Sequence, residues 1–221
     1  MCIRLIFFSL SLLSLPIFAQ QTEFGIGLSV GHSALAADQL QNEPNFAAIS
    51  PNGDWGFGLS IYGAHPIKGR LFVSTVPGIF FQDQLVAFAL VNAPGATQVE
   101  EVLNASLVLP LRVEFRSLSG NWSPVAAIGV GALLDLTAGR NGLLETNELS
   151  TFWEVAVGLE KATQHFKFRP EIFTRRGFGQ VANGTNDNIY NQALGDMSWG
   201  YIGFRLLFYG SRGRNKRLAS N

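Results

Sequence analysis

The sequence is poor in charge and carries very little cysteine or histidine. Only 14% of its 221 residues are charged, whereas soluble domains carry about 25%. Sixteen basic and sixteen acidic residues cancel, which argues against a nucleic-acid-binding protein. Hydrophobic residues make up 47% of the chain, which excludes an intrinsically disordered protein. A chain this apolar must bury itself deeply or lie in lipid.

The first 19 residues are typical of a secretory signal peptide. Arg4 is the only charge before Glu23, the run from Leu5 to Leu15 is apolar apart from serines, and Ala19 is a small residue at its exit. The run is shorter than the ~20 residues of a membrane-spanning helix, so we expect cleavage after Ala19. Cleavage removes Cys2, the only cysteine, and therefore excludes disulfides and thiolate metal sites from the mature chain.

Beyond this segment the sequence has no run long and apolar enough for a membrane helix, and apolar residues instead alternate with others. Over residues 103–116 one face is entirely apolar and the other is mostly polar or charged. Period-two alternation indicates a β-strand, because a helix would mix the two faces. Eight segments show the pattern, the third less clearly than the rest: residues 24–31, 55–62, 71–81, 103–116, 126–135, 153–160, 166–173 and 201–208.

The connections between these segments alternate in length. Long ones span residues 33–53, 82–98, 139–150 and 177–196, and short ones span 65–69, 117–121 and 162–164. This arrangement is typical of outer-membrane barrels. We therefore predict an all-β fold: an eight-stranded antiparallel up-and-down transmembrane β-barrel over residues 20–209, with four long external loops and short periplasmic turns. A basic periplasmic tail over residues 210–221 follows it.

A soluble lipocalin-type barrel also has eight strands, but there the apolar face lines the interior. Here one face is almost unbroken in its apolarity, while the other mixes glycine, serine and charges of both signs, which suits the lumen of a narrow membrane barrel. We expect outer-membrane lipid to contact the apolar face. Several aromatic residues are candidates for girdles at its edges: Trp55, Trp122, Trp153, Trp199, Tyr62, Tyr201 and Tyr209.

The same alternation turns six basic and five acidic side chains toward the lumen. Eight strands leave an interior that side chains just fill, and buried charges need partners, so we expect a structural network rather than an ion path. Hairpin register brings Glu154 near Arg175 and Glu171 near Arg205. The predicted network comprises Arg112, Glu114, Asp135, Glu154, Lys167, Arg169, Glu171, Arg175 and Arg205, with Arg116 and Glu160 on the same face.

Signals for catalysis or metal binding are weak. The topology places His32 at the outer rim and His65 and His165 in periplasmic turns, so the three histidines cannot form one catalytic site. Residues 183–188 offer side-chain oxygens but lack the acidic series of a calcium site. There is no phosphate loop, dinucleotide fingerprint or zinc spacing. We therefore expect no enzyme activity, no metal and no cofactor.

Two hairpins carry more specific motifs. The first joins residues 103–116, with Leu-Val-Leu-Pro-Leu-Arg at its centre, to a proline-started, glycine-rich strand that ends at Asp135; the second contains Phe-Lys-Phe-Arg-Pro-Glu at residues 166–171. Over about residues 70–208 the chain resembles the PorT-like outer-membrane barrels of the Bacteroidota, within the porin family. The resemblance implies an eight-stranded barrel and, for the PorT branch, a part in type IX protein secretion and gliding.

The expected function is therefore that of a non-enzymatic barrel in the cell outer membrane that assists protein secretion. Its expected partners are outer-membrane lipid and proteins of the secretion machinery, with no nucleic acid. A small passive channel or a purely structural barrel is the alternative, and a membrane-embedded lipid-modifying enzyme is the third reading.

Overall fold

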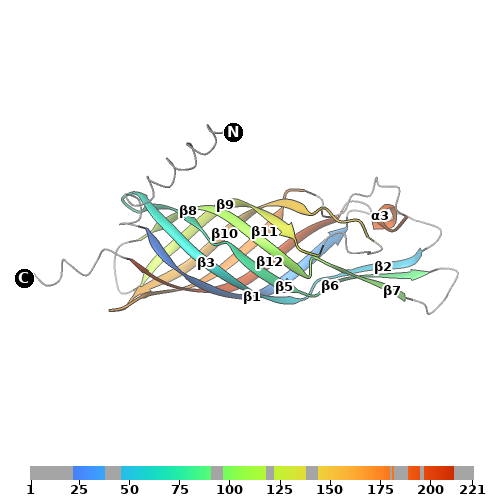
Figure 1. Cartoon of the computed structure of the whole chain (residues 1–221), viewed down its shortest axis with the longest axis horizontal. Helices are drawn as coiled ribbons and strands as arrows, with labels where there is room; N and C mark the ends of the chain where they lie inside the picture. The colour runs from blue at the N-terminus through green and yellow to red at the C-terminus, as the bar shows by residue number, and fades with distance from the viewer. Residues whose placement is uncertain are drawn as a thin grey trace, which may run out of the picture.

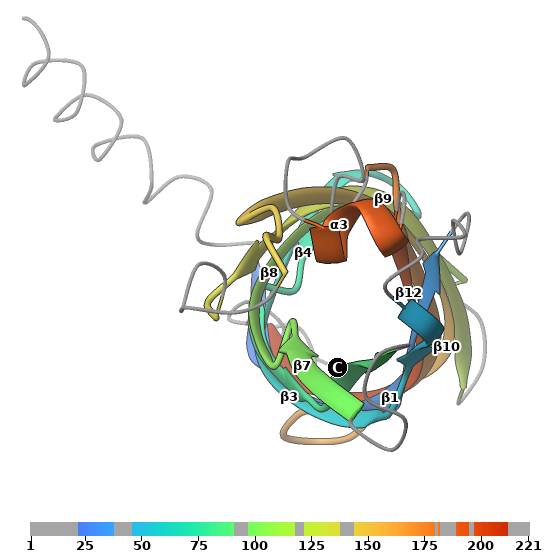
Figure 2. The same cartoon turned by 90° about the vertical axis from the view of Figure 1, so that its right-hand side faces the viewer.

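The computed structural model describes residues 22–37, 46–90, 97–117, 122–137, 144–179, 181, 189–194 and 197–211. It is an all-β protein whose strands close into an antiparallel barrel (Figures 1 and 2), as the alternation predicts. The wall is made of β1 (Glu23–Ala37), β3 (Trp55–Lys68), β4 (Leu71–Thr75), β5 (Gly78–Gln82), β8 (Ala105–Arg116), β9 (Ser123–Asp135), β10 (Leu149–Ala162), β11 (Lys167–Gly177) and β12 (Met197–Ser211). The predicted signal peptide, residues 183–188 and residues 212–221 of the predicted tail lie outside the described residues.

β4 and β5 together form one barrel strand, so the wall has eight. Both halves pair with β3 on one side and β8 on the other. Pro77 lies between them and has no N–H to donate, but its carbonyl still accepts a hydrogen bond from Ile61 N at 2.8 Å. The sheet closes where β1 pairs with both β12 and β3. Among the described strands, the barrel sheet therefore has no open edge.

The barrel has two unlike ends (Figure 1). Glu23 and Ser211 pair at one end, where the turns after β3, β8 and β10 also lie; we call it the termini end. The other is the loop end. At the termini end the turn after β3 is tighter than predicted, because Lys68 pairs with Leu71 and only two residues separate them. Gly69 has a φ of 57°, a value that glycine adopts without strain.

The loop end is more structured than four simple loops. β2 (Phe46–Asn52), β6 (Gln84–Leu90) and β7 (Thr97–Val102) form a separate three-stranded sheet, and α3 (Ile189–Leu194) is a short helix. The first two predicted loops are thus partly wrong, because Val86 and Val102 belong to a buried apolar cluster that reaches out of the barrel. No helix in the described ranges is long and apolar enough to cross a membrane.

The two faces of each wall strand differ as predicted. Leu111 and Val113 are exposed, whereas Arg112 and Glu114, which alternate with them, are buried. Leu103 is an exception: we predicted it on the outward face of a strand, but it is fully buried, has a φ of 57° and precedes the start of β8. The positive φ ends the alternation there and turns the side chain into the apolar cluster.

The predicted aromatic girdles are correct for only part of the set. Trp55 and Trp122 are exposed, at the loop end and the termini end respectively. Four others are buried instead, because they fall on the inward face of their strands. These four are Trp199, Tyr62, Tyr201 and Tyr209.

Candidate functional site

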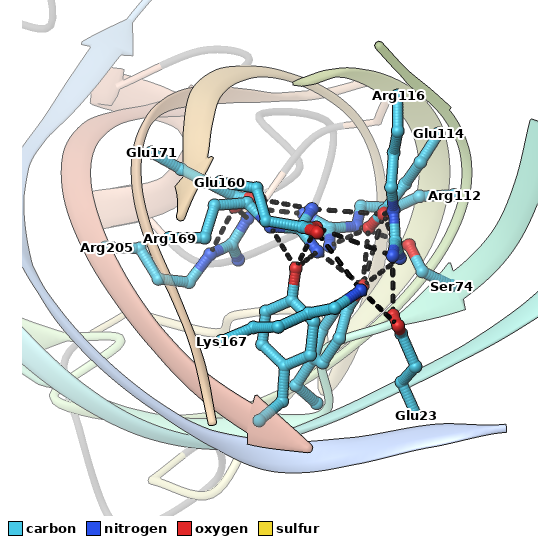
Figure 3. A network of polar contacts seen from close by, with 12 residues as sticks. Glu23, Ser74, Arg112, Glu114, Arg116, Glu160, Lys167, Arg169, Glu171 and Arg205 are labelled. Carbon is cyan, nitrogen blue, oxygen red and sulfur yellow. Dashed lines mark hydrogen bonds and ion pairs between the residues drawn. The ribbon is translucent and has the colours of Figure 1, made fainter. Parts of the chain in front are cut away.

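The carboxylate of Glu114 is the hub of a buried charge network inside the barrel (Figure 3). It accepts hydrogen bonds from Arg112 Nη2 at 2.8 Å, Arg116 Nη2 at 2.8 Å and Arg169 Nη1 at 3.0 Å. The Tyr62 hydroxyl donates to it as well, at 3.1 Å. Glu114 is fully buried, so three cations and a phenol replace the water that an ionised carboxylate requires.

A second layer of ion pairs lies toward the middle of the lumen. Glu154 binds Arg175 Nε at 2.7 Å and Arg205 Nη2 at 3.0 Å, and Glu171 binds Arg205 Nη2 at 2.8 Å. The predicted pairs Glu154–Arg175 and Glu171–Arg205 are therefore confirmed, and both are direct register partners. Arg112 joins the two layers, because its Nη1 lies 3.1 Å from Glu154 and its Nη2 binds Glu114.

At the termini end Glu23 completes the network. It pairs with Arg116 and, at 2.6 Å, with Lys167 Nζ, which also lies 3.0 Å from Glu160. The Tyr209 hydroxyl donates to Glu160 and accepts from Arg169 Nε at 3.0 Å. Sequence reasoning omitted Glu23, although it lies one residue before Phe24 and therefore has inward parity on β1.

Asp135 was predicted in this network but lies outside it. It is the last residue of β9, at the loop end, and pairs in register with Ser106. Its carboxylate accepts hydrogen bonds from the Thr137 backbone N–H at 2.8 Å and from Thr137 Oγ1 at 2.7 Å. The prediction that Asp135 faces inward was therefore right, but Asp135 lies at a different position along the barrel axis from the ion pairs.

Tyr62 and Tyr209 belong to the network, although charge alone could not identify them. The Tyr62 hydroxyl accepts from Arg116 and Arg169 while donating to Glu114. The Cζ of Arg169 lies 5.0 Å from the ring centroid of each tyrosine, within cation–π range. Their inward parity on β3 and β12 is the signal in the sequence that identifies them as lumen residues rather than girdle residues.

On the loop-end side of the ion pairs, aromatic side chains fill the lumen. Arg175 marks the boundary, since its Cζ lies 4.6 Å from the Phe80 ring and 4.8 Å from the Phe173 ring while its Nε binds Glu154. Phe173 stacks on Tyr201 with a centroid distance of 5.5 Å. Beyond them, Phe152, Trp199, Leu133 and further apolar side chains form one buried cluster up to the loop end.

Inward-facing glycines make room for the large lumen side chains. Gly129 is the register partner of Arg112, and a Cβ on it would lie 2.8 Å from Arg112 Cγ. Gly158 is opposite Glu171 in the same way, again at 2.8 Å from Cγ. A Cβ at either position would overlap the network, so the glycine-rich inner face is the steric complement of the arginines and glutamates.

No group of three or more potential metal ligands occurs among the described residues. His32 packs edge-on against Trp55 at the loop end, with ring centroids 5.9 Å apart. His65 lies at the other end of β3, where its Nδ1 is 3.1 Å from Thr22 Oγ1, and His165 is exposed. The histidines therefore do not meet, and the ion pairs form the candidate site: a buried filler in which every carboxylate is shared between cations.

Comparison with protein-family models found no match, and comparison with curated proteins found none either; neither supports the PorT-like resemblance. Among solved structures, the crystal structure of the outer membrane protein OprG from Pseudomonas aeruginosa is similar, at 12% sequence identity over 86% of this chain and 94% of that chain. The TM-score is 0.47.

Proposed function

We propose that this protein is an outer-membrane β-barrel that is exported with a cleaved signal peptide over residues 1–19. The observation that supports this is the apolar character of the outward face. Large apolar side chains are exposed on every barrel strand, among them Phe24, Ile61, Ile128 and Ile202. Soluble monomers rarely expose apolar patches beyond a few hundred Å², and the strands are long enough for a tilted crossing, which takes about 9–11 residues.

In this proposal the termini end faces the periplasm, because short turns lie there in outer-membrane barrels and long connections face outward. Gel mobility tests whether the chain forms a closed barrel. A closed barrel purified in mild detergent migrates differently before and after boiling, whereas an open sheet shows one band. Protection of the strands from added protease in vesicles, with cleavage only in the connections, is the second expected result. A chain that stays in the aqueous phase with one gel band contradicts the proposal.

The filled lumen supports a scaffold rather than a passive channel. Opening an ion path along the axis would require separating several buried ion pairs at once, among them those of Glu114 and Glu154, and unpaired buried charges are costly. We expect the wild-type barrel to show no stepwise conductance in planar bilayers. The matched double variant E114A/R169A removes two paired side chains without changing the net charge, and it tests whether the ion pairs keep the lumen closed to ions. Conductance in the wild type would establish the channel reading instead.

As a scaffold, the barrel would act through its two ends. The resemblance of the two hairpins to PorT-like proteins supports a finer role, in which these ends dock components of a protein-secretion machinery. A comparison of secreted and surface proteins with and without the gene tests this role. Loss of a defined group of exported proteins supports it, and restoration by the E114A/R169A variant would locate the activity outside the lumen. Unchanged export would leave a structural barrel.

A further inference from the structure

The charges outside the lumen network are segregated by sign between the two ends. At the termini end the exposed charged side chains among the described residues are all basic: Lys68, Arg70 and Lys161. At the loop end Arg176 is the one described basic residue outside the network. Seven described acidic residues lie with it at that end: Asp54, Asp83, Glu100, Glu101, Asp135, Glu145 and Glu148. The zero net charge of the chain therefore conceals a strong axial asymmetry.

The acidic side chains at the termini end are not available to neutralise these cations. Glu23 pairs with Arg116 and Lys167 inside the barrel. Glu160 is bound by Lys167 and by the Tyr209 hydroxyl. The exposed cations at this end therefore face outward without an acidic neighbour on the described surface.

Each cation stands beside an exposed apolar side chain at the edge of the outward face. Ile67 is 59% exposed and precedes Lys68, and Leu71, 42% exposed, follows Arg70. The Nζ of Lys161 lies 5.2 Å from the ring centroid of Trp122, which is 43% exposed. Ile67 on β3, Leu71 on β4 and Trp122, just before β9, point outward like the other exposed apolar side chains of the barrel wall. The three cations therefore lie at the border of this apolar outward face.

This combination fits one chemical environment. Tryptophan prefers the boundary between hydrocarbon and water, and lysine and arginine lay their apolar stems along hydrocarbon while the charged group reaches the polar layer. Cations at that depth attract anionic phospholipids. A docked acidic protein would instead need a surface that projects away from the band.

We propose that Lys68, Arg70, Lys161 and Trp122 form a basic collar that binds the headgroups of anionic phospholipids in the leaflet at the termini end. The proposal rests on the proposed function, since it requires the barrel to lie in a membrane. The collar fixes the depth of the barrel and enriches anionic lipid around its periplasmic mouth.

The test measures headgroup selectivity of the intact barrel in phosphatidylcholine vesicles that contain spin-labelled phosphatidylglycerol or spin-labelled phosphatidylcholine. We expect the motionally restricted shell around the wild type to favour phosphatidylglycerol by about fivefold for each basic residue engaged. The triple variant K68Q/R70Q/K161Q should bring the preference close to one. High salt should weaken it in the wild type, because exposed charges are screened.

The matched control is R176Q, which removes one exposed arginine at the loop end, against R70Q, which removes one at the termini end. R70Q should lower the preference and R176Q should not. Equal effects, or a preference that survives in the triple variant, overturn the collar. Insertion without any headgroup preference overturns it too, and leaves open an acidic protein as the partner of these cations. Failure of the wild type to insert contradicts the proposed function instead, so the two failures are distinguishable.

Discussion

In the half of the lumen nearer the termini, charged side chains from β1, β8, β10, β11 and β12 pair with one another, and each carboxylate serves two or three cations. In the half nearer the loops, Phe80, Phe152, Phe173 and Trp199 pack with aliphatic side chains in one apolar cluster. Both halves are filled by buried side chains. They differ in what a small change would leave behind: an unpaired charge in the first, a small cavity in the second.

The comparison shows how a narrow barrel can gain a rigid interior without an apolar core along its whole length. Ion pairs hold fixed geometry but depend on complete pairing. Apolar contacts tolerate exchange between side chains of similar volume. Arg175 belongs to both halves, through its ion pair with Glu154 and its contacts with Phe80 and Phe173, and it connects the two kinds of packing.

The largest effect should follow the loss of the hub carboxylate. E114Q leaves Arg112, Arg116 and Arg169 without their shared anion, and the free energy of unfolding should fall by about 3–5 kcal/mol. Urea unfolding in vesicles, followed by tryptophan fluorescence and gel mobility, measures it.

The matched control is D135N, which neutralises an inward carboxylate outside the network. It should cost about 1 kcal/mol, the value of an ordinary hydrogen bond. Equal losses for E114Q and D135N would mean that the network is no more important than an isolated carboxylate.

Removing the hydroxyl of a tyrosine in the charged half should have an intermediate effect on stability, and removing one in the apolar half should not. The Tyr62 hydroxyl binds Arg116, Arg169 and Glu114, so Y62F should destabilise the barrel by about 1.5–3 kcal/mol, the range for hydrogen bonds to charged groups. The buried Tyr201 hydroxyl has no hydrogen-bond partner among the described atoms, so Y201F should be neutral or slightly stabilising. The same unfolding assay applies, and a larger loss for Y201F would contradict the division of the lumen into two halves.

A smaller loss than that of Y62F should come from a conservative change in the apolar half. F152L keeps a buried apolar side chain of similar size and should cost about 1 kcal/mol. The loss of stability in F152L can be compared with the loss in Y62F, a substitution that removes fewer heavy atoms than F152L. A loss for F152L that exceeded the loss for Y62F would show that packing, not pairing, dominates lumen stability.

Much of the fold could be predicted, because period-two alternation depends only on which face of a strand turns outward and which turns into the barrel. The outward parity of Leu111 and Val113 and the inward parity of Arg112 and Glu114 were readable in this way. The pair of Glu154 with Arg175 also followed, since the short turn between β10 and β11 fixes the local register. The pair of Glu171 with Arg205 followed from the antiparallel pairing of β11 with β12, which a long connection joins. The extra sheet β2-β6-β7 did not, because its strands are short and β2 pairs with β6, which is distant from it in sequence.

The candidate site was partly accessible for the same reason. Parity showed which charges face inward but gave no depth along the axis, so it included Asp135 with the ion pairs. Glu23 and the hydroxyls of Tyr62 and Tyr209 enter the network from strands at the seam of the barrel, where β1 meets β3 and β12. Their partners Arg116, Glu114 and Glu160 lie on β8 and β10, strands that do not pair with β1, β3 or β12, and no local pattern encodes a contact of that kind.

The sequence by itself determined the barrel strands, their two faces and a lumen with nearly balanced charge, because alternation is a local property of an extended chain. Only the tertiary structure decided that Glu114 is shared by three arginines and that aromatic packing replaces ion pairs toward the loop end. It also decided that, among the described residues outside the network, basic side chains lie at the termini end and acidic ones, with Arg176, at the loop end. These features depend on the height at which each strand crosses the barrel, which closure and stagger set for all strands together.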